Sequence, residues 1–151
     1  MLPLSAVLLV DDDPTTNFLN RRLLRCLAVQ PEVLVASNGL AALKLLQDRC
    51  HQATDCTCPT LVLLDMNMPV MSGMEFLETF VKVQLPVAQR QGIVIVLLTT
   101  TLLERDLARL RQLPVVEVLH KPLTEQAITN IIASYFGESH LKSYAGGESV
   151  Q

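Results

Sequence analysis

The sequence predicts an α/β fold in which helices cover both faces of a parallel sheet. Five short apolar stretches alternate with stretches that have helical spacing or helix caps, and this alternation is typical of repeated strand–helix units. The apolar stretches contain few polar residues, as is usual for strands buried on both faces. The chain has 151 residues, 50% hydrophobic and 18% charged, which suits one folded domain with a substantial core.

The first strand is expected at residues 5–10, an apolar run that ends at three aspartates. Asp13 and Pro14 then predict a helix start, because Asp is a favourable N-cap and Pro fits the first helical position. Apolar residues recur in this helix at helical spacing, so we expect them to face the sheet with the arginines on the other side. They are Phe18, Leu19, Leu23, Leu24 and Leu27.

A second strand is expected at residues 33–36. An Asn-Gly turn leads from it into a second helix, which begins over residues 40–46 with Leu43 and Leu46 facing inward. The third strand, residues 61–64, runs directly into Asp65. Burying an unpaired carboxylate is costly, so Asp65 should lie at the exit of this strand.

A third helix is expected from Gly73 to about residue 83, and residues 85–91 are expected to form a connecting loop that contains Pro86. The most apolar strand follows at residues 93–98 and ends at three threonines.

The remaining elements are a fourth helix at residues 102–113 and a fifth strand at residues 115–119, followed by Lys121 and Pro122. Thr124 then caps a last helix that ends near residue 136.

We divide the chain into a domain of residues 1–137 and a polar tail of residues 138–151, rich in Gly and Ser and expected to be loose. No DNA-binding or enzymatic output domain fits into so short a tail. The domain is therefore expected to be of a stand-alone type.

Charge and hydropathy exclude several partners. The net charge of −3 leaves no electrostatic footprint for nucleic acid. No apolar run reaches the ~18 residues that span a bilayer, and no basic amphipathic stretch suits a membrane surface. The apolar residues 2–10 lack a positive leader and precede aspartates instead of a cleavage site. A cytoplasmic protein is expected.

Three of the four cysteines, Cys50, Cys56 and Cys58, lie close to His51 in a segment that resembles a loop insertion, residues 49–59. They could bind a metal, but the spacing lacks the Cys-x2-Cys pairs of zinc sites, which favours reduced thiols in a loop. This segment precedes the third strand and so lies at the opposite edge of the sheet from the ends of the strands, where we expect no catalytic part for it.

Polar residues follow four of the five strands: Asp11 and Asp12, Asp65, Thr99, and Lys121. In a parallel sheet these positions share one edge, where carboxylates so close together repel by several kcal/mol at an effective dielectric of ~20. A divalent cation relieves this repulsion, and oxygen ligands at an open edge suit Mg²⁺. With the lysine and the hydroxyl group they form a receptacle for a phosphoryl group, with a carboxylate as nucleophile. The alternative, that all are ordinary turn residues, is hard to reconcile with the whole set in this order.

The motifs resemble those of the receiver domain of two-component response regulators, over about residues 4–136. The stretches that carry the resemblance are Val10-Asp11-Asp12-Asp13-Pro14, Asp65-Met66-Asn67-Met68-Pro69-Val70-Met71-Ser72-Gly73, Thr99 and Lys121-Pro122. The resemblance implies a flavodoxin-like, doubly wound sheet of five parallel strands in the order 2-1-3-4-5.

The resemblance also implies roles for individual residues. Asp65 would be the phospho-acceptor. Asp12 and Asp65 would bind Mg²⁺ directly together with the backbone carbonyl of Asn67, and Asp11 would act through a water molecule. Thr99 and Lys121 would contact the phosphoryl oxygens.

The implied reaction is transfer of a phosphoryl group to Asp65 from a phosphohistidine or a small phosphodonor, with positioning and charge neutralisation as the sources of catalysis. Water later hydrolyses the acyl phosphate. Asn67 and Thr101 would border the path of this water and tune the lifetime, unless they are simple turn residues. Such a protein is no enzyme toward other substrates, since it catalyses only its own phosphorylation and dephosphorylation.

The implied partners are a sensor histidine kinase or a histidine phosphotransfer protein and a downstream protein that the sequence does not identify. The chain itself is expected to be a monomer or a weak homodimer. The family's usual partner surface corresponds to the helix at 102–113, the strand at 115–119 and the last helix.

One departure from the family concerns the switch. Receiver domains usually carry Tyr or Phe three residues before the lysine, where this chain has Val118. A valine has no ring to turn and is stiff at χ1. We therefore expect the signal to leave through Thr99 and the segment of residues 100–113.

Two other functions compete with the phospho-acceptor. Enzymes of the haloacid-dehalogenase type also phosphorylate an Asp after a strand, but they need a second Asp two residues on, and Asn67 cannot transfer protons at neutral pH. A pseudo-receiver would be an interaction module without phosphorylation, against which the full set of site residues argues. A dinucleotide-binding fold is disfavoured because no Gly-x-Gly-x-x-Gly follows the first strand.

Overall fold

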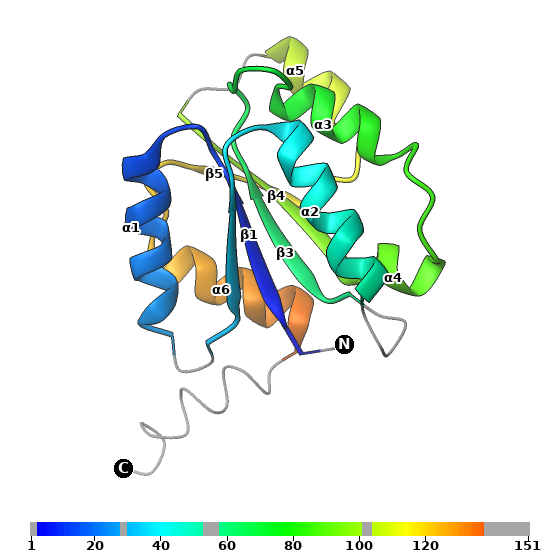
Figure 1. The fold of residues 1–151 in the computed structure, drawn as a ribbon. Helices are drawn as coiled ribbons and strands as arrows, with labels where there is room; N and C mark the ends of the chain where they lie inside the picture. The colour runs from blue at the N-terminus through cyan, green and yellow to red at the C-terminus, as the bar shows by residue number, and fades with distance from the viewer. Residues whose placement is uncertain (1–2, 28–29, 53–57, 101–103, 138–151) are drawn as a thin grey trace.

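A computed structural model describes residues 3–27, 30–52, 58–100 and 104–137 of the chain. In these parts the strands form one parallel sheet in the order β2-β1-β3-β4-β5. Figure 1 shows this sheet in the middle of the molecule, between the helices. The strands are β1 (Ala6–Val10), β2 (Glu32–Ala36), β3 (Thr60–Leu64), β4 (Ile93–Thr99) and β5 (Glu117–His120). The predicted fold class and strand order are confirmed.

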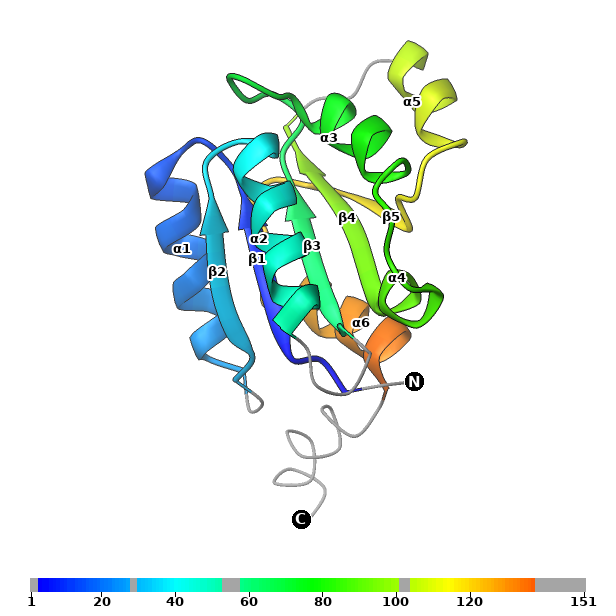
Figure 2. The ribbon, with the colours of Figure 1, turned by 45° about the vertical axis from the view of Figure 1, so that its right-hand side comes forward.

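Helices cover both faces of this sheet (Figures 1 and 2). They are α1 (Pro14–Arg25), α2 (Gly39–Gln52), α3 (Gly73–Phe80), α4 (Val87–Gly92), α5 (Glu104–Leu110) and α6 (Glu125–Phe136). Helices α1 and α6 cover one face, whereas α2 and α3 lie on the other. The sheet is thus the middle of three layers.

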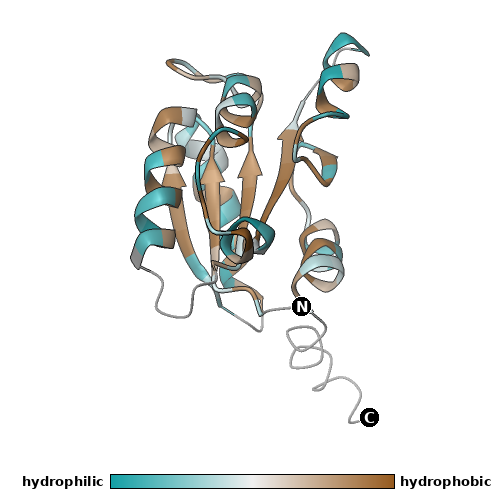
Figure 3. Cartoon of the chain, turned by 90° about the vertical axis from the view of Figure 1, so that its right-hand side faces the viewer, coloured by the Kyte–Doolittle hydropathy of each residue, from teal (hydrophilic) through white to brown (hydrophobic). Residues whose placement is uncertain are grey.

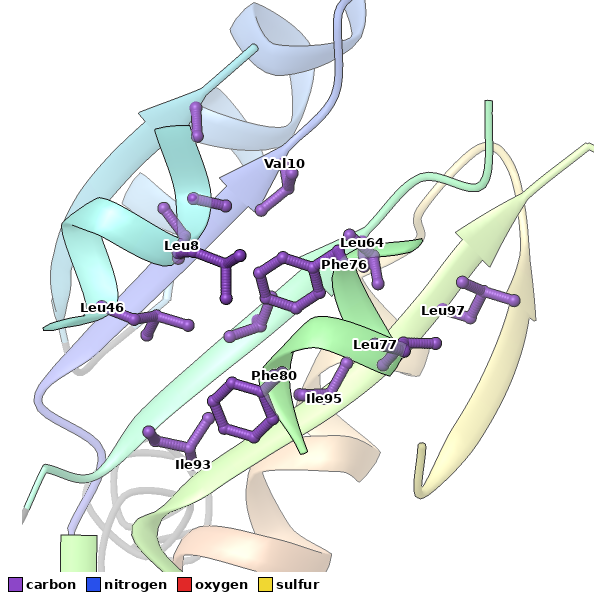
Figure 4. Packing of buried hydrophobic residues seen from close by; sticks show 14 of the residues in the cluster. Leu8, Val10, Leu46, Leu64, Phe76, Leu77, Phe80, Ile93, Ile95 and Leu97 are labelled. Atoms are coloured by element: carbon purple, nitrogen blue, oxygen red, sulfur yellow. The ribbon is translucent and has the colours of Figure 1, made fainter. Parts of the chain in front are cut away.

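Alternating side chains of the strands divide the core into two clusters. In β1, Leu8 and Val10 point to the cluster under α2 and α3, and Val7 and Leu9 point to the cluster under α1 and α6. Figure 3 shows apolar strands with the hydrophilic helix surfaces turned away from them. Figure 4 shows the first cluster, in which the ring of Phe76 lies close to strands β1 and β3. Strands buried on both faces explain why each predicted strand is a continuous apolar run.

The predicted orientation of α1 is right for Leu24 and Leu27, which are buried, and for the exposed arginines, but wrong for Phe18 and Leu19. Phe18 and Leu19 are 61% and 54% exposed, whereas Asn17, Asn20 and Leu24 are buried. The Asp13 cap fixes where the helix starts, and from there the positions at 17, 20 and 24 fall on the face toward the sheet. Two polar amides therefore line the inner face of α1, and two large apolar side chains lie in solvent.

The predicted loop at residues 49–59 was wrong in its first part, because α2 continues to Gln52. This extension brings Cys50 into the core, where Cys58 is also buried. The buried Gln89 donates a hydrogen bond of 2.8 Å from Nε2 to the Cys50 carbonyl. Cys56 lies outside the described residues. A hydrogen bond with Cys58 and, after it, burial raise the pKa of the Cys50 thiol, so these two cysteines are structural thiols of the core.

The predicted loop at residues 85–91 contains the short helix α4, and α3 ends at Phe80, earlier than expected. The guanidinium of Arg90 in α4 donates to the carbonyls of Phe80 and Val83, and its Cζ lies 4.9 Å from the centre of the Phe80 ring. These contacts satisfy carbonyls at the end of α3 and hold the connection against the core.

The other boundaries agree with the prediction within a few residues, and Thr124 caps α6 through a hydrogen bond from the Ala127 N–H. The predicted tail at residues 138–151 lies outside the described residues. Among the helices that are described, none combines the length and the apolar character needed to cross a membrane.

Candidate functional site

The carboxyl ends of β1 and β3 lie side by side, because Val10 pairs with Leu64 in the parallel register. The residues that follow, Asp11 and Asp65, are therefore neighbours, and the Asp65 N–H donates to the Val10 carbonyl at 2.9 Å. One carboxylate oxygen from each of Asp11, Asp12 and Asp65 lies within 4.8 Å of the others. Among the described residues this is the one group of three acidic, His or Cys side chains that could hold a metal ion. We call it the acidic cluster.

A single lysine from the end of β5 reaches this cluster. Lys121 Nζ lies 2.6 Å from Asp11 Oδ2 and 3.2 Å from Asp65 Oδ1. The backbone N–H of Lys121 donates to the Thr99 carbonyl at 2.9 Å, which fixes the lysine beside the end of β4. The Lys121–Pro122 peptide bond is cis. The structure thus brings together the predicted acids and the predicted lysine from three different strands.

The electrostatics of the cluster follow from this crowding. Burial raises the pKa of Asp65, the charge of Asp11 raises it further, and Lys121 opposes both effects only in part. Burial alone would lower the pKa of Lys121, but its hydrogen bond to Asp11 and the nearby carboxylates raise it overall, so the ammonium group stays charged. The site therefore carries more negative charge than one lysine balances.

The turn after β1 is fixed by its own side chains. Asp13 caps α1 by accepting from the Thr15 N–H at 3.1 Å and from the Thr16 hydroxyl at 2.7 Å. These hydrogen bonds lower the pKa of Asp13, that with Thr16 most, so it serves as an ionised cap. The Asp13 N–H in turn donates to Asp11 Oδ1 at 2.9 Å. Asp13 therefore orients the cluster without belonging to it.

Asn17 is a site residue that the sequence did not reveal. It is buried on the inner face of α1, and its Nδ2 donates to the Asp11 backbone carbonyl at 2.8 Å. Asn17 follows Asp11 by six residues, a spacing that allows this hydrogen bond once the start of the helix is known. Because Phe18 and Leu19 were expected to face the sheet, Asn17 was not expected to be buried.

The turn after β3 is closed by close backbone contacts. The Gly73 N–H donates to the Met66 carbonyl at 2.9 Å. Ser72 and Glu75 form a reciprocal capping box that starts α3. A short, capped connection of this kind holds Asp65 in place at the strand end.

The remaining predicted residues are distributed around the cluster. Thr99 is fully buried at the end of β4, and Asn67 is exposed beyond Asp65. Val118 is half-buried in β5, pairs with Leu97 and packs against the core cluster under α2 and α3. Thr101 lies outside the described residues.

The donor set fits a small, hard cation. Carboxylate oxygens are the ligands that Mg²⁺ prefers, and it usually binds through one or two of them while it keeps several waters. The three carboxylates lie close together, and burial disfavours the charged form of Asp65. A divalent cation between them would stabilise all three charges. The cluster can therefore hold a divalent cation at the buried Asp65 carboxylate.

Comparison with known proteins finds the same architecture elsewhere. A family model described as the response regulator receiver domain matches residues 7–133 of this chain. The response regulator Rcp1 of Synechocystis sp. is 32% identical over 75 residues, which are 50% of this chain and 50% of that protein, so the match spans half the length of this relative.

Two solved structures extend the similarity to most of the chain. A two component response regulator from Cytophaga hutchinsonii has a TM-score of 0.72 and 28% identity, covering 88% of this chain and 97% of that one. A response regulator receiver protein from Dyadobacter fermentans has a TM-score of 0.72 and 25% identity, covering 88% of this chain and 98% of that one.

Proposed function

The chain belongs to the response regulator receiver domain family, and on this basis we propose that it accepts a phosphoryl group on Asp65 in a Mg²⁺-dependent reaction. The observation that carries the proposal is the contact of Lys121 with both Asp11 and Asp65 inside the acidic cluster. Signalling through such a group would make the protein a phospho-accepting switch of a two-component system.

Asp65 is the nucleophile in this proposal. An oxygen of its carboxylate forms a bond to phosphorus while the bond from phosphorus to the histidine nitrogen of the donor, or to the leaving oxygen of a small phosphodonor, breaks. An ionised carboxylate needs no general base for this step. Lys121 lies within reach of Asp65 and can hold the phosphoryl oxygens by charge, with the Thr99 hydroxyl as a second donor.

The cation site would be made by Asp12, Asp65 and the backbone carbonyl of Asn67, with Asp11 acting through a water molecule. Mg²⁺, when bound, would neutralise charge on the transferred group. Asp11 would then be free to exchange its contact with Lys121 for the water, which leaves the lysine for the phosphoryl group.

The lifetime of the acyl phosphate would depend on access of water. Asn67 is exposed next to Asp65, which supports a role at the mouth of the site. Thr101 is proposed as the second residue on this path. Substitutions at either position should change hydrolysis more than phosphorylation.

The proposed donors are a sensor histidine kinase or a histidine phosphotransfer protein, and the proposed output is a protein contact or onward phosphotransfer. The candidate output surface comprises α5, β5 and α6, and it includes Leu107 of α5 and Val116 just before β5, which are 40% and 43% exposed. We further propose that residues 1–137 form the receiver domain and residues 138–151 a tail, and that the chain acts in the cytoplasm as a monomer or weak homodimer.

Intact-mass measurement after incubation with acetyl phosphate and Mg²⁺ tests the phospho-acceptor. The wild-type protein should gain one phosphoryl group, and Asp65→Asn should not. Asp48→Asn is a matched control, because Asp48 is exposed on α2, away from the cluster, and this variant should still be phosphorylated. A wild-type protein whose mass does not change, with acetyl phosphate or with a phosphorylated histidine donor, would instead favour a pseudo-receiver.

A further inference from the structure

The side-chain amide of Asn17 donates a hydrogen bond through its nitrogen, but its oxygen has no partner among the described residues. It is only 9% exposed, and its Nδ2 donates to the backbone carbonyl of Asp11. Its Oδ1 is buried and accepts no hydrogen bond from the residues that the structure describes. Buried polar atoms almost always have a partner, so an unpaired amide oxygen beside the acidic cluster needs an explanation.

Of the side chains nearby, Arg21 and Ser37 are donors, but neither is hydrogen-bonded to this oxygen. An amide oxygen only accepts hydrogen bonds, and the ionised carboxylates of Asp11 and Asp12 also only accept. The missing group must therefore be a donor, and water is the donor that fits such a place.

Asn17 lines a cavity of about 380 Å³. The cavity lies between the start of α1 and the end of β2, and is lined by Asp11, Asp12 and Asn17 together with Pro14, Phe18, Arg21, Val35 and Ser37. A water molecule in liquid occupies about 30 Å³, so several waters fit. The cavity connects the buried amide with the two aspartates that begin the acidic cluster.

We propose that Asn17 is a positioning residue of the cation site, which fixes the Asp11 backbone through Nδ2 and accepts through Oδ1 a hydrogen bond from a water of the Mg²⁺ hydration shell. The proposal rests on the proposed function, because it assumes that the acidic cluster binds Mg²⁺. Waters bound to a cation are strong hydrogen-bond donors, and Asn17 Oδ1 is an acceptor that no described residue uses. Residues of this kind, behind the direct ligands, typically contribute 10- to 100-fold to metal affinity.

Isothermal titration calorimetry of the full chain with Mg²⁺, starting from metal-free protein at neutral pH, tests the proposal. Asn17→Leu removes both polar groups while keeping the branched shape of the side chain, and should weaken Mg²⁺ binding about tenfold or more. Asn20→Leu is the matched control, because Asn20 is 7% exposed on the same face of α1 but does not line the cavity. This control should bind Mg²⁺ with the affinity of the wild type, even if the substitution lowers the stability of the fold.

A second pair of variants separates the two groups of the amide. Asn17→Asp keeps an acceptor in place but loses the donor to Asp11, and Asn20→Asp adds the same charge elsewhere on the helix. If the acceptor matters, Asn17→Asp should bind Mg²⁺ more tightly than Asn20→Asp. Binding weaker than that of Asn20→Asp would overturn the role of Oδ1. This pair also decides the matter if Asn17→Leu does not fold.

The outcomes distinguish this inference from the proposed function. Wild-type protein without affinity for Mg²⁺ at millimolar concentration would contradict the proposed function and the inference with it. Wild-type protein that binds Mg²⁺, together with an Asn17→Leu variant of equal affinity, would overturn the inference alone.

Discussion

Gly73 lies against the backbone of Asp65 so closely that a Cβ atom at Gly73 would come within 2.3 Å of the Asp65 carbonyl oxygen. The contact joins the start of α3 to the end of β3. Because the obstacle is backbone, no side chain can rotate to make room. The close approach therefore sets both the path of the turn and the position of the proposed phospho-acceptor.

Gly73→Ala should consequently destabilise the protein by about 1–3 kcal/mol, the usual cost of overpacking, and should slow phosphorylation by acetyl phosphate. Urea unfolding and intact-mass time courses measure the two effects. Gly92→Ala is the control, since its nearest neighbours would lie 3.2 Å from the added Cβ and belong to Cys58, away from the cluster. Phosphorylation of Gly73→Ala at the wild-type rate would show that the turn does not set the geometry of Asp65.

Asp65→Asn should stabilise the metal-free protein at neutral pH. The pKa of Asp65 is raised above its usual 3.8, chiefly by burial. The folded state then holds its proton to higher pH than the unfolded state, so stability falls as pH rises from about 4 through the folded pKa. Removing the charge should raise the free energy of unfolding by about 1 kcal/mol. Two like charges 4 Å apart at a dielectric of 20 repel by ~4 kcal/mol. The expected gain is smaller because Lys121 offsets part of this repulsion.

Urea unfolding of both proteins from acidic to neutral pH, in the presence of a chelator, measures this difference. The wild type should lose stability over that interval relative to Asp65→Asn, and saturating Mg²⁺ should restore it in the wild type only. If the free energy of unfolding depended on pH in the same way in both proteins, Asp65 would not be the acid whose buried charge destabilises the fold.

Lys121→Met should bind Mg²⁺ more tightly than the wild type, by about three- to tenfold. In the metal-free protein Lys121 occupies oxygens of both Asp11 and Asp65, and a cation entering the cluster must overcome its positive charge. The same variant should lose most phosphorylation, because the ammonium group that would hold the phosphoryl oxygens is gone. Calorimetry and intact mass give the two readings. Lys82→Met, at an exposed site, should change neither. Weaker Mg²⁺ binding would mean that Lys121 supports the cation instead of competing with it.

Arg90→Met should lower the free energy of unfolding by about 2 kcal/mol, because hydrogen bonds from a charged donor to the carbonyls of Phe80 and Val83 would be lost. Contact with the Phe80 ring would be weakened as well. Arg105→Met, exposed on α5, should change stability by no more than about 0.5 kcal/mol. Equal effects in the two variants would show that Arg90 does not anchor α4.

The strands and the acidic cluster were predictable from the sequence for one physical reason. Strands buried on both faces must be apolar throughout, so the polar residue that ends each run marks the edge of the sheet. Once the strands are parallel, Asp11, Asp65 and Lys121 must meet at that edge. The contacts of Lys121 with both acids follow from this geometry.

The residues that the sequence did not reveal are those whose burial depends on tertiary partners. Asn17 is buried because it donates to the Asp11 carbonyl, a contact that no periodicity of apolar residues can show. Phe18 looked like a core residue by its chemistry alone, yet it is exposed. Helix α4 depends on Arg90 reaching the carbonyls of Phe80 and Val83, so its six residues show no helical pattern of their own.

The route of the signal leads to a last prediction. Val118 is half-buried in β5 and has no ring that could turn inward, so we expect a change at Thr99 to pass along the chain that follows it. Helix α5 buries only Leu110, and elements with few buried contacts open most easily. Amide hydrogen exchange with and without beryllofluoride, a phosphate mimic, should therefore change in residues 100–113 by several-fold and hardly in α2. Asp65→Asn should remove this response, and Val118→Ala should retain it, because the switch does not depend on that side chain. An unchanged segment 100–113 in protein that has bound the mimic would refute this route.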